Sequence, residues 1–275
     1  MPRSPLESVT ESATGELPQA EPAERTPPPG STAPRPAYER IETAPRSHLS
    51  PVAPSPTPDW EALEPRGLYA RLAKPLLRGL LLVVSLPPAL LVGIPIALVN
   101  AILFRSVRKV FYRQPRVGYR GRIFTIIKFR TLRDGEGGDF DSWSDGDDVT
   151  RVTRFGHFLR TTHLDELPQL WNILRGEMDF IGPRPEMVEI DRWARARIPS
   201  FRERNALLPG VTGYAQVTHG YAPKDPAAYA RKLWADQHYR RSVSLALDLR
   251  ILSRTLVWMV RGRGWGLARR VTSEE

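Results

Sequence analysis

The sequence contains no cysteine. This absence excludes a disulfide framework and any zinc site built from thiolates, and it agrees with a protein of a reducing compartment. Histidine is also scarce, with five in 275 residues, and the histidines lack the spacing of metal ligands. The first residues do not place an apolar core behind a basic start, so no cleavable signal peptide is expected.

Charge is unevenly distributed along the chain. The formal net charge is +10. Residues 1–65 hold 5 Arg and 10 acidic side chains, which leaves 35 basic and 20 acidic side chains in residues 66–275. A body this basic favours an anionic partner, either nucleic acid, phospholipid headgroups or a phosphorylated substrate. No basic motif interleaved with aromatic residues is found, so nucleic acid is not expected.

Composition divides the chain into four parts. Residues 1–65 carry 15 of the 27 prolines and few large apolar side chains, so they cannot bury enough apolar surface to offset their chain entropy and are predicted to be a disordered tail. Residues 66–105 are predicted to be a membrane helix, and residues 106–265 a catalytic domain. Residues 266–275 are predicted to be a C-terminal tail.

The predicted membrane helix contains 26 consecutive residues, 79–104, without a charged side chain. A straight helix of that length would measure about 39 Å, enough to cross a bilayer core of about 30 Å. However, Pro87 and Pro88 lie in the middle of the segment, directly after Ser85 and Leu86. Each proline removes a backbone donor, and a serine can satisfy a freed carbonyl.

Basic residues flank the apolar segment on both sides, with four in residues 66–78 and five in residues 105–116. Basic flanks mark the cytoplasmic side of a membrane. A helix that enters the bilayer, breaks at Ser85–Pro88 and leaves on the same face agrees with both the prolines and the charges. The alternative is a single kinked span.

The remaining sequence predicts a mixed α/β domain that is mostly helical. Strand-prone residues near 107–112 and 121–129 flank a glycine-containing turn, which predicts a small β-hairpin. Apolar periodicity predicts helices over residues 164–174, 187–198, 227–241 and 245–260. The last helix places Leu245, Leu249, Leu252, Leu256 and Met259 on one face. This face predicts either an amphipathic helix in the membrane interface or a helix packed on the core.

A pair of adjacent carboxylates, Asp165 and Glu166, carries the clearest sign of chemistry. Pro168 belongs in the first turn of a helix, so the periodicity places the pair at a helix N-terminus, where free amides favour anions. Two such carboxylates can hold a divalent cation, and one of them can attack phosphorus. By themselves, acidic residues at a helix start are more often capping residues than catalytic ones.

Cations surround the carboxylate pair in the sequence. Arg184 stands between two prolines, which suits bidentate recognition of phosphate by a preordered guanidinium. Arg160 precedes the pair, and Lys128 and Arg130 end a predicted strand. An Asp-x-Asp pattern at residues 139–141 lies in a very acidic stretch, where it arises easily, so we interpret that stretch as a surface loop.

Together these stretches resemble the bacterial sugar transferase family, the monotopic phosphoglycosyl transferases. The resemblance covers about residues 66–265, and its matching segments follow the order of the family: residues 85–88, 111–118, 128–131, 160–174, 182–185, 208–217 and 236–248.

The resemblance implies a two-step transfer through a covalent intermediate. Asp165 would attack the sugar-bearing phosphate of a nucleotide diphosphate sugar, most simply a UDP-sugar, and a polyprenyl (undecaprenyl) phosphate would then accept the sugar phosphate. Mg²⁺ would be held by Asp165 and Glu166, while Lys128, Arg130, Arg160 and Arg184 would bind phosphate oxygens. The residues implied near the nucleotide sugar are Pro185, Glu186, Tyr214 and Gln216.

The resemblance also implies a place in the cell. The expected location is the bacterial inner membrane with the catalytic domain on the cytoplasmic face, at the start of synthesis of an exopolysaccharide, capsule or O-antigen. A homodimer is compatible with the sequence. Two alternatives stay open: a membrane-tethered glycosyltransferase that releases nucleoside diphosphate, and a non-catalytic protein that binds anionic lipid.

Overall fold

The computed structural model describes residues 57–133, 151–220 and 222–260. These residues belong to one compact unit of the chain, Pro36–Glu275. The expectation of a mixed α/β fold that is mostly helical, with one long apolar helix and small sheets, is confirmed. Most of the tail predicted for residues 1–65, the acidic loop and the C-terminal tail lie outside the described residues.

The last residues of the predicted tail, 57–65, are among the described residues and contain a short helix. Helix α2, Trp60–Leu63, begins at Asp59, whose carboxylate accepts hydrogen bonds from the backbone N–H groups of Glu61 and Ala62. Glu64 then accepts hydrogen bonds from Tyr119 and Arg120. These contacts to the domain order a segment whose composition alone indicates disorder.

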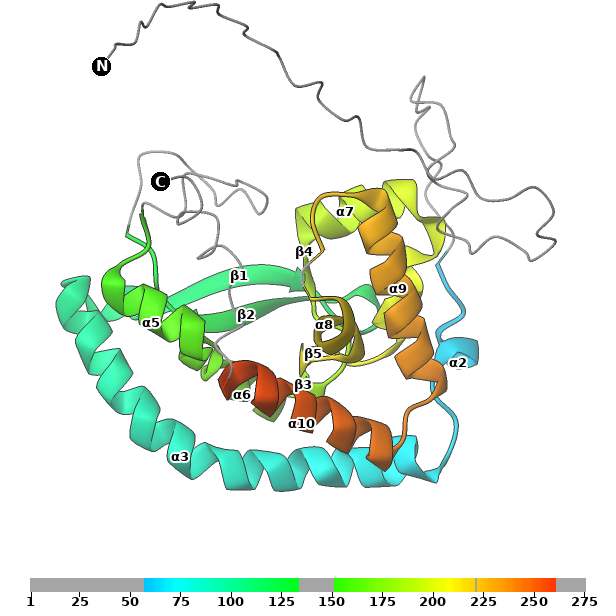
Figure 1. Ribbon diagram of the computed structural model, residues 1–275, viewed down its shortest axis with the longest axis horizontal. Helices are drawn as coiled ribbons and strands as arrows, with labels where there is room; N and C mark the ends of the chain where they lie inside the picture. Colours follow the sequence, from blue (N-terminus) through cyan, green and yellow to red (C-terminus); the bar gives the residue numbers. More distant parts are fainter. Residues whose placement is uncertain (1–56, 134–150, 221, 261–275) are drawn as a thin grey trace, which may run out of the picture. The chain divides into compact units, whose positions relative to one another are not determined.

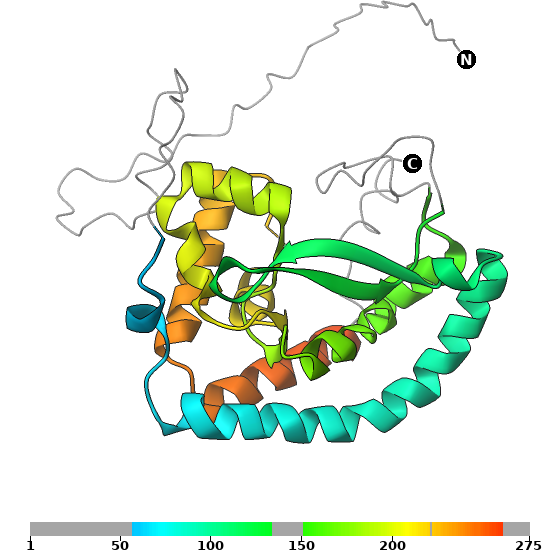
Figure 2. The same cartoon turned by 180° about the vertical axis from the view of Figure 1, so that it is seen from behind.

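The long apolar helix α3 spans Lys74–Leu103 and continues the π-helical turn η1, Tyr69–Ala73. The sequence predicted a break at Ser85–Pro88, and this prediction is wrong. Helical structure continues through Pro87, Pro88 and Pro95. Instead the helix curves along its length (Figures 1 and 2). Prolines inside a helix remove donors and crowd the preceding turn, which bends a helix without ending it.

Helix α3 is long and apolar enough to cross a membrane by length and composition. Only Ile96 and Asn100 in it are buried. Most of its large apolar side chains are exposed, including Leu80, Val83, Leu91 and Leu98.

The predicted hairpin is present, with its first strand beginning four residues later than expected and its second strand two residues later. Residues Val107–Lys109 form the 3₁₀ turn η2, and strand β1 then spans Phe111–Val117. Strand β1 pairs antiparallel with β2, Ile123–Phe129, and with the two-residue strand β4, Glu186–Met187. The sheet order is therefore β2-β1-β4, with β1 in the centre.

A second, parallel pair joins β3, Asp179–Ile181, to β5, Gly210–Thr212. The two backbones approach each other closely after β3. A Cβ on Gly182 would lie 2.2 Å from the carbonyl oxygen of Leu208, and a Cβ on Gly210 would lie 2.1 Å from the nitrogen of Gly182. Glycine at both positions lets the segment that begins at Pro183 pass directly beside β5.

The remaining helices and short helical turns are α5, Arg154–Thr162, η4, Leu164–Glu166, α6, Gln169–Leu174, α7, Val188–Arg197, η5, Pro199–Ala206, α8, Tyr214–His219, α9, Pro226–Arg241, and α10, Leu245–Val260. A further 3₁₀ turn, η3, Tyr119–Gly121, connects the hairpin strands. Helices α3 and α10 lie along one edge in both views, whereas α7 lies at the opposite edge (Figures 1 and 2).

The helix predicted over residues 164–174 is shorter than expected. Residues Leu164–Glu166 form a 3₁₀ turn, and α6 begins only at Gln169. Because a 3₁₀ turn advances by a different angle per residue, the predicted apolar face is not continuous. Trp171 and Leu174 are exposed, whereas Gln169 is buried.

Candidate active site

A left-handed residue brings the carboxylate pair to the surface of a pocket. Helix α5 ends at Thr162; its cap residue His163 has φ +58°, and the chain then turns directly into η4. A positive φ is uncommon for histidine and strains the backbone slightly. After this turn Asp165 and Glu166 line the pocket, with Glu166 in contact with Lys128 of β2.

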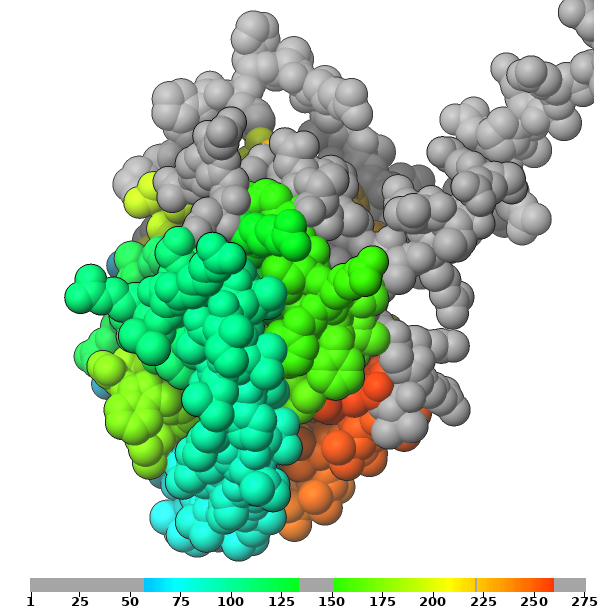
Figure 3. Space-filling view, turned by 90° about the vertical axis from the view of Figure 1, so that its left-hand side faces the viewer, coloured from blue at the N-terminus to red at the C-terminus, as the bar shows by residue number. Residues whose placement is uncertain are grey.

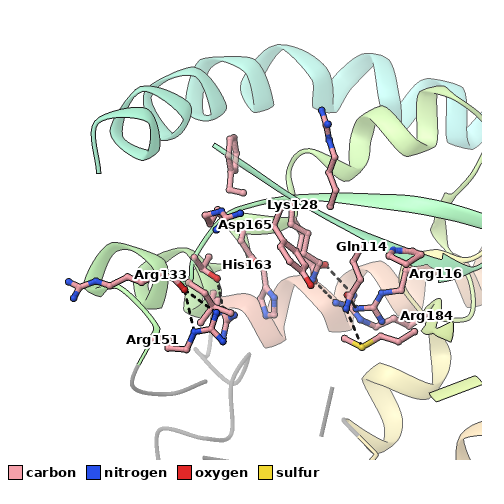
Figure 4. A pocket seen from close by; sticks show the side chains of 18 of the residues that line it. Gln114, Arg116, Lys128, Arg133, Arg151, His163, Asp165 and Arg184 are labelled. Atoms are coloured by element: carbon pink, nitrogen blue, oxygen red, sulfur yellow. Dashed lines mark hydrogen bonds and ion pairs between the residues drawn. The ribbon is translucent and has the colours of Figure 1, made fainter. Parts of the chain in front are cut away.

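An open pocket of about 710 Å³ surrounds the pair. Eight Arg or Lys side chains line it against three carboxylates, so it suits a ligand with several negative charges. The eight are Arg113, Arg116, Lys128, Arg130, Arg133, Arg151, Arg160 and Arg184. In Figure 4, Arg133 and Arg151 lie on one side of Asp165 and Lys128, and Gln114, Arg116 and Arg184 lie on the other.

Glu166 is held by two cations. Lys128 donates a hydrogen bond of 2.7 Å to Oε1, and Arg184 donates to both carboxylate oxygens. Arg184 also donates to the carbonyl of Val211 at 3.1 Å. Burial by itself would raise the pKa of Glu166, but Arg184 and Lys128 hold it well below its usual value. Glu166 is therefore a permanent anion that orders both cations beside Asp165.

The surroundings of the Asp165 carboxylate differ from those of Glu166. Asp165 is 8% exposed, and within the described residues no hydrogen bond is donated to its carboxylate. Burial raises the pKa of Asp165; Lys128 opposes that shift, and the adjacent Glu166 adds to it. A carboxylate that is poorly solvated and lacks hydrogen-bond donors is a stronger nucleophile than one held by ion pairs.

The remaining predicted phosphate ligands also line the pocket. Arg160 donates a 2.8 Å hydrogen bond from Nε to the buried hydroxyl of Thr131. Arg130 lies over the ring of Phe104, with 5.8 Å between the guanidinium carbon and the ring centroid. The structure thus brings Lys128, Arg130 and Arg160 to one pocket with the carboxylate pair.

Four residues implied near the nucleotide sugar lie outside this lining. Pro185 and Glu186 follow Arg184, but Glu186 is buried and pairs with Lys232 of α9. Tyr214 packs with its ring 5.0 Å from that of His238. Gln216 donates to the carbonyl of Val211 at 3.4 Å. Their role near the sugar stays a prediction.

Sequence reasoning did not single out one wall of the pocket. Strand β1 contributes Tyr112, Arg113, Gln114 and Arg116. Burial and the nearby Arg184 lower the pKa of Arg116 to about 10. The signal was available, because residues 111–118 form one of the segments that resemble the family. Arg133 and Arg151 carried no comparable signal, since they meet through a backbone hydrogen bond between segments far apart in sequence.

Carboxylate oxygens are the protein ligands that a magnesium ion would need in this pocket. Within the described residues no group of three or more His, Cys, Asp or Glu side chains is arranged to hold a metal. Magnesium often takes only one or two carboxylates and completes its shell with water and substrate phosphates. Asp165 fits that pattern, whereas both oxygens of Glu166 already accept hydrogen bonds from cations. The residues therefore fit an ion that the phosphates of a ligand help to hold.

Comparison with known proteins agrees with this geometry. The family model described as "Bacterial sugar transferase" matches residues 70–262. The UDP-glucose:undecaprenyl-phosphate glucose-1-phosphate transferase of Caulobacter vibrioides is 38% identical over 210 residues, which are 75% of this chain and 78% of that protein.

Two further relatives differ in length. The UDP-N-acetylgalactosamine-undecaprenyl-phosphate N-acetylgalactosaminephosphotransferase of Aeromonas hydrophila is 39% identical over 174 residues, 62% of this chain and 40% of the relative. The exopolysaccharide production protein ExoY of Sinorhizobium fredii is 31% identical over 220 residues, 74% of this chain and 91% of the relative.

The family match spans the apolar helix, the hairpin and the whole pocket, and the Caulobacter relative is matched over more than two thirds of its length. The chain belongs to the bacterial sugar transferase family.

Proposed function

We propose that the protein transfers a sugar 1-phosphate from a UDP-sugar to undecaprenyl phosphate, and so begins the synthesis of an exopolysaccharide. The relatives named as sugar-phosphate transferases support this substrate pair. The single observation that carries the proposal is the contrast inside the carboxylate pair. Glu166 is neutralised by Lys128 and Arg184, while Asp165 beside it makes no such ion pair with any residue that the structure describes.

In the first step, Asp165 acts as the nucleophile. One carboxylate oxygen forms a bond to the sugar-bearing phosphorus as the bond from that phosphorus to the bridging oxygen breaks, and UMP leaves with the bridging oxygen. The basic wall of the pocket supports this step, because it offsets charge on the phosphates before and during transfer.

In the second step, an oxygen of undecaprenyl phosphate attacks the same phosphorus. The bond to Asp165 breaks, the aspartate is regenerated, and undecaprenyl diphosphate sugar is formed. Glu166 keeps Lys128 and Arg184 beside the phosphorus in both steps. Arg160 and Arg130 reach the same pocket and are proposed to bind the remaining phosphate oxygens.

A magnesium ion would be held by Asp165 together with substrate phosphates. When bound, it would offset the negative charge of the diphosphate. Glu166, the second predicted ligand, would share its oxygens between the ion and its ion pairs with Lys128 and Arg184.

The contacts of α3 support a re-entrant helix and a membrane location. Near its start, Lys74 donates hydrogen bonds to Asp248 and Tyr239 and to the carbonyl of Ile181. Near its end, Asn100 donates to two backbone carbonyls of the catalytic domain, those of Val110 and Arg130. A helix that crossed a bilayer would place its ends on opposite sides, about 30 Å apart, whereas both ends here bind one domain.

Exposed apolar side chains on α10 support an interfacial position for that helix. Leu245, Leu249 and Leu256 are exposed. Asp248 and Ile251, on the other side of α10, are buried. If the predicted apolar face packed on the core, Leu245, Leu249 and Leu256 would be buried. Their exposure therefore favours a helix in the membrane interface over a helix that packs this face on the core.

The surface of α3 lies beside those of α5 and α10 on one face of the protein (Figure 3). This arrangement is compatible with a catalytic domain that rests on the cytoplasmic face of the inner membrane. There a soluble nucleotide sugar and a lipid-borne phosphate can both reach Asp165.

The test is the identity of the released nucleotide. Full-length protein in lipid nanodiscs is incubated with undecaprenyl phosphate and a panel of radiolabelled UDP-sugars, and products are separated by chromatography. The proposal expects UMP and a labelled lipid with at least one donor. Release of UDP would identify a glycosyltransferase that moves the sugar alone. An absence of turnover with every donor, in protein that is folded and inserted, would count against catalysis.

A further inference from the structure

The main chain of the segment that carries Arg184 accepts three hydrogen bonds through its carbonyl groups. Pro183 and Pro185 have no N–H group to donate. Their carbonyls accept hydrogen bonds from Gly210 N at 3.0 Å and from Arg116 Nη1 at 3.2 Å. Between them, the carbonyl of Arg184 accepts a 2.8 Å hydrogen bond from Nη2 of Arg204.

Arg204 is an unusual residue to find behind a substrate pocket. It lies in η5, is 2% exposed, and does not line the pocket. Its Nε donates a 2.8 Å hydrogen bond to Asp236 of α9, which is also buried. Its Nη1 lies 3.8 Å from Glu186, and its guanidinium packs over the ring of Phe201.

A buried ion pair of this kind is weak evidence for a role in stability. Desolvation of an arginine and an aspartate offsets most of their attraction, and apolar residues of similar size can pack as well. The ion pair does, however, fix the orientation of the Arg204 guanidinium, which apolar packing would not do. With Nε held by Asp236, the planar guanidinium presents Nη2 to one carbonyl, that of Arg184.

We infer that Arg204 is a positioning residue for the transfer reaction, which holds the main chain of Arg184 so that the Arg184 guanidinium stays on Glu166. Asp236 fixes the orientation of Arg204. Lys232 pairs with Glu186 and fixes the residue that follows the second proline. The inference rests on the proposed function, and it adds two residues outside the pocket that act through Arg184.

Substitution of Arg204 should therefore lower the rate of sugar-phosphate transfer without an equal loss of UDP-sugar binding. Displacement of a phosphate-binding group by about 1 Å can slow a reaction by about 100-fold. Arg204→Lys keeps the charge, but an ammonium cannot hold Asp236 and the Arg184 carbonyl in one plane. We expect kcat to fall at least about 10-fold, with KM for the UDP-sugar within about 3-fold.

A double-mutant cycle tests whether Arg204 acts through Arg184. Arg204→Lys is introduced into the full-length chain with Arg184 present and with Arg184→Ala, and kcat is measured in nanodiscs. If Arg204 acts through Arg184, its substitution changes kcat by less than about 2-fold in the Arg184→Ala background. Equal losses of kcat in the two backgrounds would overturn the inference. Binding of inorganic pyrophosphate, followed by calorimetry, is the second readout and should change by less than about 3-fold in Arg204→Lys; a loss of binding as large as the loss of kcat would contradict a positioning role.

Controls separate this result from misfolding and from failure of the proposed function. Arg195→Lys alters another arginine, paired with Asp191 at 3.0 Å and not linked to Arg184, and should leave kcat within about 2-fold. If Arg204→Lys does not fold, as judged by thermal unfolding, Asp236→Asn takes its place in the same cycle. Absence of UMP release by the native protein would refute the proposed function. An active native protein with equal losses would refute only the role of Arg204.

Discussion

Lys74, at the start of the apolar helix, donates a 2.8 Å hydrogen bond to Asp248 of α10, 174 residues later in the sequence. Asp248 is fully buried and also accepts hydrogen bonds from Tyr69 and Tyr239. The cluster joins the long apolar helix α3 to α10, the helix with the exposed apolar face. It fixes how α3 and α10 lie relative to each other.

Lys74→Met should destabilise the protein by about 3 kcal/mol, because it leaves the buried carboxylate of Asp248 without its cation. Thermal and denaturant unfolding in a mild detergent measure the change. The control is Arg71→Met, one helical turn earlier and exposed, which should change stability by less than about 0.5 kcal/mol. Adding Asp248→Asn to Lys74→Met should recover part of the loss. If the double variant is no more stable than Lys74→Met, the ion pair is not what holds the helices.

Asp165→Asn should lower turnover by several orders of magnitude, because it keeps the shape of the side chain but removes the nucleophile. Incubated with UDP-sugar and without lipid, the native protein should gain the mass of one sugar phosphate at Asp165. Intact-protein mass spectrometry followed by peptide mapping measures this adduct. Glu203→Gln, outside the pocket, is the control and should form the adduct normally. Kinetics in which both substrates bind before any product leaves, without an adduct, would contradict the covalent mechanism.

The acid limb of the pH profile of adduct formation should lie at higher pH than it would for an aspartate of ordinary pKa. Asp165 must be ionised to attack, and burial raises its pKa, so activity should be lost as pH falls through this raised value. Lys128 favours the ionised form. Lys128→Met should therefore move the acid limb to still higher pH, while Lys128→Arg should leave it close to the native position. The rate of adduct formation against pH measures both, and a downward shift in Lys128→Met would contradict the assignment.

Cysteines introduced singly at Arg66 and Arg105 should both react with a membrane-impermeant maleimide only from the cytoplasmic side. The reason is that Lys74 and Asn100, toward the two ends of α3, bind the same domain. The native chain has no cysteine, so each label reports one position. Labelling from opposite sides of the membrane would identify a single span in place of a re-entrant helix.

Deletion of residues 1–56 should leave transfer activity within a few-fold, because the matching family segment begins at residue 70. Deletion through Pro65 should lower the unfolding temperature, since it also removes the contacts of Glu64 with Tyr119 and Arg120. Activity assays and thermal unfolding of both truncated proteins measure the difference. Equal unfolding temperatures would show that the ordered segment around α2 does not stabilise the domain.

Local patterns were enough to predict several elements. Helices α7, α9 and α10 and the β1–β2 hairpin lie close to their expected positions, because apolar periodicity and turn residues act over a few neighbours. The length and apolarity of α3 were equally visible. The same is true of the acid pair at Asp165 and Glu166, whose resemblance to a family is carried by contiguous residues.

The sequence by itself determined which residues carry charge and which segments are apolar, but the tertiary structure decided how they are used. Asp165 and Glu166 are neighbours of the same chemical type, yet Lys128 and Arg184 bind only the second of them. Those cations come from a strand end and a proline-fixed segment that no local pattern places together. The ends of α3 likewise bind one domain because Asp248 and Arg130, distant in sequence, lie beside them in space. Burial and ion pairing depend on such long-range contacts. These contacts therefore determine the pKa of each carboxylate, and they hold both ends of α3 on the same domain.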